Sequence, residues 1–228
     1  PEHFNYKELD PISDLEKIEL ITDIAQKLDE THPLKKMKGN IGNLVKSLGQ
    51  IFDWMKKEDV SASTISQEIA KLKNDIQTDE KYRYKRAHKD FKKGDLKIDL
   101  VRKTEKKLND LSAAAELSKT FAQKMLAMNR YDYADMILWV IDLFQNDANV
   151  LADYQEQFQF ILVDEFQDTS GAQNSVLQLL INYWEKPHVC VVGDDDQSIY
   201  RFQGAEVKNV LDFAEQHKQH LKSILLKQ

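Results

Sequence analysis

The sequence is poor in cysteine and in long apolar runs. Cys190 is the single cysteine among 228 residues, so the chain can form neither an internal disulfide nor a zinc site built on several cysteines. Because Cys190 lies within an apolar stretch, we expect a small buried side chain and not a nucleophile. No apolar run approaches the roughly 18–20 residues that cross a bilayer, and no secretory signal opens the chain. We therefore expect a cytoplasmic protein that does not contact membranes.

The charge of the chain is unevenly distributed. The net charge is −6, yet residues 81–107 hold twelve Lys or Arg against four acidic residues, a local charge of +8, so the remainder carries −14. Tyr82, Tyr84 and Phe91 are interleaved with these cations. Such a segment can bind a nucleic-acid backbone, because salt screening limits attraction to about 8–10 Å, but it can equally be a solvated helix face. The sequence alone leaves both alternatives open.

Apolar residues recur at helical spacing through the first 130 residues. Ser13 and Glu16 form a capping-box pattern, which predicts that a helix begins there and runs to about Asp29. The same periodicity predicts further helices over residues 41–55, 61–76 and 104–129. These stripes are typical of a helical core, and we predict a mainly α-helical domain over residues 1–125.

Two short apolar runs in the C-terminal part each end in acidic residues. Residues 158–163 precede Asp164-Glu165, and residues 189–192 precede Gly193 and three aspartates, with a helix-like segment between Gly171 and Pro187. Such runs suit strands buried on both faces of a parallel sheet, and a right-handed crossover brings both acidic ends to one edge. Ligands bind at that edge of open α/β sheets. Periodicity adds helices over 136–144 and 207–220 and a closing strand over 223–226.

The residues at this predicted edge suit nucleotide chemistry. A strand-end aspartate such as Asp164 can hold Mg²⁺ through water, and the adjacent Glu165 can orient or deprotonate an attacking water. The Gln197 amide can donate to a phosphate oxygen and sense a γ-phosphate. However, strand ends often carry acids simply to face water, so the short Asp-Glu pattern alone favours a role without catalysis.

Longer motifs favour a specific family. The segments ILVDEFQDT (161–169) and VVGDDDQSIYRFQGA (191–205) closely resemble the second and third signature motifs of the UvrD/Rep family of superfamily 1 DNA helicases. The resemblance extends to residues 131–137 upstream and 224–228 downstream, and is only loose before residue 131. One departure is Gln203, where relatives commonly carry arginine.

The resemblance implies roles for individual residues. Asp164 would hold Mg²⁺, Glu165 would activate water for ATP hydrolysis, and Gln197 would couple the γ-phosphate to DNA. Tyr200 and Phe202 would stack on single-stranded DNA beside Arg201, and stacking does not depend on base sequence. The resemblance also favours duplex or fork contact by basic residues of the helical part, namely Lys85, Arg86, Lys92 and Lys93.

The resemblance also implies a fold and an activity. We expect an α/β fold: a partial RecA-like parallel sheet with flanking helices over residues 126–228, and a helical insertion subdomain over residues 1–125. The parent would be an ATP-dependent 3′-to-5′ DNA helicase acting in repair or replication. No Gly-x-x-x-x-Gly-Lys-[Ser/Thr] motif occurs. We therefore expect a monomeric piece of a longer helicase that does not hydrolyse ATP by itself.

Three alternatives remain at this stage. The chain could be the motor part of a helicase–nuclease whose nuclease residues follow Gln228. It could be a metal-dependent nuclease built on Asp164, Glu165 and Asp194–Asp196. It could also be a helical DNA- or protein-binding module without enzymatic activity, in which the sheet is only a scaffold.

Overall fold

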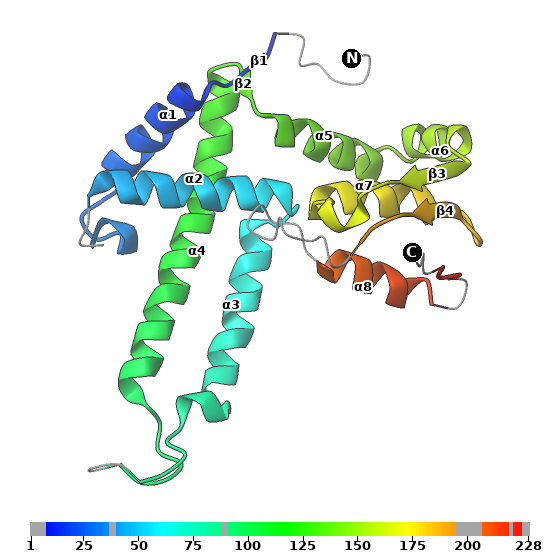
Figure 1. Cartoon of the computed structure of the whole chain (residues 1–228). Coiled ribbons are helices and arrows are strands. Elements are labelled where there is room, and N and C mark those ends of the chain that lie inside the picture. Colours follow the sequence, from blue (N-terminus) through cyan, green and yellow to red (C-terminus); the bar gives the residue numbers. More distant parts are fainter. Residues whose placement is uncertain (1–7, 37–39, 88–90, 195–206, 219–220, 225–228) are drawn as a thin grey trace. The chain divides into compact units, whose positions relative to one another are not determined.

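The computed structural model describes residues 8–36, 40–87, 91–194, 207–218 and 221–224 (Figure 1). Contacts divide the chain into two compact units, of which the first holds residues 1–55 and 60–132 and the second residues 56–59 and 133–228. Among the described residues, no helix is both long enough and apolar enough to span a membrane. The expected domain boundary at residues 125 and 126 stays a prediction.

The first unit is built from helices. Its long helices are α1 (Asp14–Gln26), α2 (Ile41–Lys57, whose last two residues belong to the second unit), α3 (Ala62–Ile76) and α4 (Ile98–Ala127). Two 3₁₀ helices, η1 (Pro33–Lys36) and η2 (Glu80–Tyr82), lie between them in the chain. The strands β1 (Asp10–Pro11) and β2 (Arg130–Tyr131) form a parallel pair.

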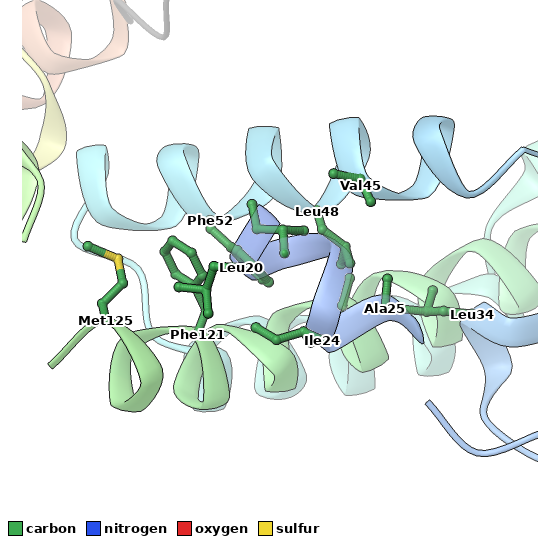
Figure 2. Packing of buried hydrophobic residues seen from close by; sticks show 11 residues of the cluster. Leu20, Ile24, Ala25, Leu34, Val45, Leu48, Phe52, Phe121 and Met125 are labelled. Carbon is green, nitrogen blue, oxygen red and sulfur yellow. The ribbon is translucent and has the colours of Figure 1, made fainter. Parts of the chain in front are cut away.

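Apolar stripes on α1, α2 and α4 form the main core of this unit. Figure 2 shows Phe52 of α2 and Phe121 of α4 pointing toward each other, and their rings stack with centroids 5.0 Å apart. Leu20 and Ile24 of α1 and Leu48 of α2 are buried in the same cluster. Burying such side chains contributes roughly 1.5–3 kcal/mol each, so this cluster fixes how the three helices pack.

A second cluster joins α3 to α4, which run side by side (Figure 1). Ile65 and Ile69 of α3 are buried with Ala115 of α4. Ser61 caps α3, because its hydroxyl accepts from the N–H of Thr64 at 3.1 Å. The predicted stripe over residues 61–76 is therefore a core stripe, as expected.

In the first unit, the helix boundaries differ most from the sequence prediction in two places. The first helix ends at Gln26 and not near Asp29, and Pro33, which disfavours helix in the residue before it, opens η1. The long helix begins at Ile98, six residues earlier than Thr104. Within the described residues between Arg83 and Leu96 there is no helix, and these two residues form an antiparallel bridge. The alternative of a solvated helix face is therefore wrong for the described residues between Arg83 and Leu96, whereas residues 98–107 of the basic segment do lie on α4.

The second unit is an α/β arrangement. It contains α5 (Tyr133–Asn146), α6 (Ala148–Gln157), β3 (Phe160–Val163), η3 (Phe166–Asp168), α7 (Gly171–Ile181), β4 (His188–Val191) and α8 (Val207–Gln216). The strands β3 and β4 pair in parallel, with Phe160 opposite His188 and Val163 opposite Val191. This crossover through α7 confirms the predicted fold class. The helix α6 was not predicted, and residues 221–224 are not in a strand.

One face of the β3–β4 pair packs on a core. Ile161, Val163, Val189 and Val191 contact a buried cluster that consists of Phe166, Leu177, Ile181 and Phe213. The alternate residues face the other way, and Phe160 and Leu162 are 73% and 82% exposed. The prediction of strands buried on both faces is therefore wrong for the described residues. Cys190, expected to be buried, is exposed for the same reason, because successive strand residues point to opposite faces.

Glu16 should make the first unit sensitive to acid. Its carboxylate accepts from the Ser13 N–H at 2.9 Å, the Ser13 hydroxyl at 2.8 Å and Arg130 Nε at 3.0 Å. In that order these donors lower the pKa of Glu16 from 4.5 to about 2. Because the folded pKa lies below the unfolded one, the stabilisation is complete above about pH 5 and is lost as the pH falls toward about 2. We expect Glu16→Gln to reduce this loss in urea titrations at pH 7, 5 and 3.

The control for this experiment is Glu19→Gln, which changes an exposed glutamate on the same helix. It should leave the acid sensitivity of the chain unchanged. If Glu16→Gln and the unmodified chain lost stability identically with falling pH, Glu16 would not be the source of the acid sensitivity.

Phe166 should be essential to the core of the second unit. Its side chain is 2% exposed and packs edge to face on Phe213, with ring centroids 5.3 Å apart. Phe166→Ala should lower the free energy of unfolding by about 3–5 kcal/mol in denaturant titrations of the 228-residue chain. Phe160→Ala removes the same atoms from an exposed strand position, where only ring stacking on His188 is lost, and should cost below about 1 kcal/mol. Equal losses of unfolding free energy in the two variants would argue against Phe166 as a core residue of the second unit.

Candidate functional site

The first strand tip turns sharply immediately after β3. Glu165 has φ 49° and ψ 43°, the left-handed region that side chains other than glycine rarely adopt. Asp164 supports this turn, because its Oδ1 accepts from the N–H of Glu165 at 3.0 Å. The N–H of Asp168 then donates to the carbonyl oxygen of Glu165 at 2.8 Å, which closes η3. Phe166 enters the core while Asp164 and Glu165 stay exposed. The turn therefore presents two carboxylates to solvent.

The second strand tip lies against the first. The N–H of Val192 donates to the carbonyl oxygen of Val163 at 2.8 Å, and the N–H of Phe166 donates to that of Val192 at 2.9 Å. Beyond them, the N–H of Asp194 donates to the Gln167 side chain at 3.0 Å. These bonds extend the pairing of β3 and β4 past both strands. The structure thus brings Asp164, Glu165 and Asp194 to one carboxyl edge, where the sequence places them.

Gln167 is a site residue that the sequence reasoning missed. Its side chain is 2% exposed, although it stands between acidic residues of an exposed turn. Its Nε2 donates to Glu165 Oε2 at 2.6 Å, and its Oε1 accepts from Asp194. Its position within the second motif is the one sequence feature that could have indicated a role for Gln167. The resemblance assigned roles in that motif only to Asp164 and Glu165.

The carboxylates at this edge do not form a protein cage for a metal. Among the described residues, no group of three or more His, Cys, Asp or Glu side chains could hold an ion. This arrangement would leave a divalent cation to take water or other oxygen ligands besides the described carboxylates. It gives no support to the metal-dependent nuclease, for which Asp195 and Asp196 lie outside the described residues.

The helix that follows the turn is firmly anchored. Ser170 and Gln173 form a capping box, with the Ser170 N–H donating to Gln173 Oε1 at 2.9 Å. The N–H of Gly171 donates to Glu58 Oε2 at 3.0 Å, and a Cβ at Gly171 would lie 2.7 Å from the Glu58 carbonyl oxygen. No side chain larger than hydrogen fits there. A shallow cavity of about 230 Å³ beside this anchor is lined by none of the predicted site residues.

The predicted DNA-contacting cations of the first unit lie on a narrow tip. Backbone bonds between Tyr84 and residues 94–95 pair its two arms, and Gly94, with φ 96°, makes the predicted turn. Tyr84 and Phe91 stack with ring centroids 4.8 Å apart. The tip cations are exposed on both arms, and they are Lys85, Arg86, Lys92 and Lys93. By contrast, Arg83 donates to the carbonyl oxygen of Gly94 at 2.8 Å and is structural.

The remaining predicted site residues belong to the third motif. They lie outside the described residues, as does the departure at Gln203, and they are Gln197, Tyr200, Arg201 and Phe202. Their assigned roles stay predictions.

Comparisons with known proteins agree with this geometry. Residues 12–218 match the family model of the UvrD/REP helicase N-terminal domain. The chain is 38% identical over 126 residues to an ATP-dependent DNA helicase PcrA of Staphylococcus epidermidis, a match covering 54% of the chain and 17% of that protein. It is 34% identical over 182 residues to a DNA helicase II of Rickettsia typhi, covering 78% and 27% respectively.

The matched region is thus a small part of each relative, at most about a quarter of its length in these two cases. The family match, however, covers most of this chain and includes both strand tips. The chain belongs to the UvrD/REP helicase family, through its N-terminal domain.

Proposed function

We propose that this chain is the part of an ATP-dependent 3′-to-5′ DNA helicase that activates water at the nucleotide and contacts DNA. The observation that supports it most strongly is the exposed pair Asp164-Glu165 at the shared carboxyl edge of β3 and β4, with the Glu165 carboxylate hydrogen-bonded by a buried amide. Family membership supports the same proposal. The process served would be DNA repair or replication.

Asp164 and Glu165 divide the hydrolytic work in this proposal. Asp164, exposed at the edge, would hold the Mg²⁺ of Mg-ATP, and that ion would neutralise charge on the phosphates. Glu165 would orient the attacking water and accept its proton. Gln197 would donate to the γ-phosphate. The sequence contains no Gly-x-x-x-x-Gly-Lys-[Ser/Thr] loop to surround the phosphates, so we propose that the chain alone is inactive.

DNA contact is proposed at two places. Tyr200 and Phe202 would stack on single-stranded bases beside Arg201, in the segment that follows the second strand tip. The basic tip would contact duplex or fork phosphates through its exposed cations, which lie on both of the paired arms. No described feature favours a nuclease or a module without enzymatic activity over the motor.

Glu165→Gln tests the hydrolytic role in the full-length protein. The substitution keeps the size of the side chain but removes the base, so DNA-stimulated ATP turnover should fall by about 10²–10⁴-fold. The affinity for ATP, measured with a fluorescent analogue, should change little, because Glu165 acts on water and not on the phosphates.

Glu185→Gln is a matched control, since Glu185 is exposed in the loop after α7. Near-normal turnover of Glu165→Gln would refute the role of Glu165 in activating water. It would favour the alternative in which this chain is a binding module without enzymatic activity of its own.

Charge reversal tests the basic tip. In fluorescence anisotropy of the 228-residue chain with forked DNA, Lys92→Glu/Lys93→Glu and Lys85→Glu/Arg86→Glu should each weaken binding. Each lost phosphate contact should make the plot of log affinity against log salt shallower by about 0.7–0.9, because fewer counterions are released.

Lys46→Glu/Lys186→Glu makes the same change in net charge at exposed residues elsewhere and should have a much smaller effect. Equal losses in both kinds of variant would show that only the overall charge matters. Absence of binding at low salt would place DNA contact outside this chain.

A further inference from the structure

Gln167 uses both ends of its buried amide at the candidate site. One end accepts from the backbone N–H of Asp194 at 3.0 Å, and the other donates to Glu165 Oε2 at 2.6 Å. The two partners come from different strand tips, which are separated by the whole of α7 in the chain. A single side chain therefore links the second tip to the carboxylate of the first.

The chemistry of the partners fixes the orientation of this amide. A backbone N–H can only donate, so the amide oxygen must face Asp194. The amide nitrogen then faces Glu165, whose ionised carboxylate can only accept. A flipped amide would place two donors together on one side and two acceptors on the other. The bridge is thus directional, and each end matches its partner.

Gly193 holds the second tip close to the amide. A Cβ at this position would lie 2.7 Å from Gln167 Oε1 and 3.4 Å from the Gln167 backbone nitrogen. Its φ is not in the left-handed region, so the reason for glycine here is space and not backbone conformation. Any side chain would separate the tip from the amide oxygen.

Glu165 needs such support because of its own backbone. Its left-handed conformation is disfavoured, and its side chain is otherwise exposed to water. Asp164 holds its N–H from one side, and Gln167 holds its carboxylate from the other. A carboxylate that must orient a water molecule gains from being fixed before the reaction.

We propose that Gln167 is a positioning residue, which sets the Glu165 carboxylate according to the place of the Gly193–Asp194 backbone. Movement of the second tip would shift the amide and with it the carboxylate. The inference rests on the proposed function, since it assumes that Glu165 activates water. It assigns to Gln167 a role in the rate of hydrolysis and not in nucleotide binding.

Gln167→Glu separates the two ends of the bridge in the full-length protein. The new side chain keeps an acceptor for the Asp194 N–H but places an oxygen, and not a donor, against Glu165. We expect kcat for DNA-stimulated ATP hydrolysis to fall at least tenfold, with KM for ATP within twofold. Gly193→Ala, which displaces the other end, should lower kcat in the same way.

Gln167→Met is the second variant, because it removes both hydrogen bonds without adding a charge to the interior. Its matched control is Gln155→Met in α6. Gln155 is also buried, at 6% exposure, and its Nε2 donates to the carbonyl oxygen of Leu179 at 2.7 Å. Both Met variants should lower the thermal unfolding midpoint, but only Gln167→Met should lower kcat of the folded enzyme.

A double-mutant cycle distinguishes positioning from a general loss of structure. In a Glu165→Gln background the carboxylate is absent, so Gln167→Met should have no further effect on residual turnover. An equal fold-loss in both backgrounds would overturn the inference, as would a kcat within twofold of normal for Gln167→Met. If Glu165→Gln abolishes turnover in those cases, the proposed function still stands. Normal turnover of Glu165→Gln itself would overturn both.

Discussion

The candidate site depends on backbone hydrogen bonds that continue the pairing of β3 and β4 past the ends of both strands. The N–H groups of Val192 and Phe166 are each used across the tips. Because a backbone group removed from water needs a partner, the chain after Val163 stays beside the residue that follows β4, and Phe166 bonds to Val192. Phe166 thereby reaches the core, and the two preceding residues remain at the surface.

The tips depend on each other for this arrangement. Gln167 lies buried in the first tip, and a buried amide is costly unless both of its ends are hydrogen-bonded. One partner comes from the same turn and the other from the second tip. The first tip therefore reaches its final form only when β4 has paired with β3. The close approach at Gly193 is part of the same requirement.

The parallel strands, the shared acidic edge and the capping box at Ser13 could be predicted, because each rests on local periodicity or a short motif. The burial of Gln167 could not, because a polar residue among acids gives no sign of the backbone that will approach it. The exposure of Leu162 and Cys190 was missed since an apolar run does not show which of its two faces is covered. The shape of the basic tip depends on the pairing of Arg83 with Leu96, which no local sequence pattern predicts.

The pairing of β1 with β2 brings the beginning and the end of the first unit together. The N–H of Asp10 donates to the carbonyl oxygen of Asn129, and the N–H of Ile12 donates to that of Tyr131, so the chain arrives and departs at the same place. A body whose two ends lie side by side can be added to a host protein, or removed from it, with little disturbance of the host backbone. The first unit thus has its two ends fixed to each other by backbone hydrogen bonds, and only residues 56–59 leave it between those ends.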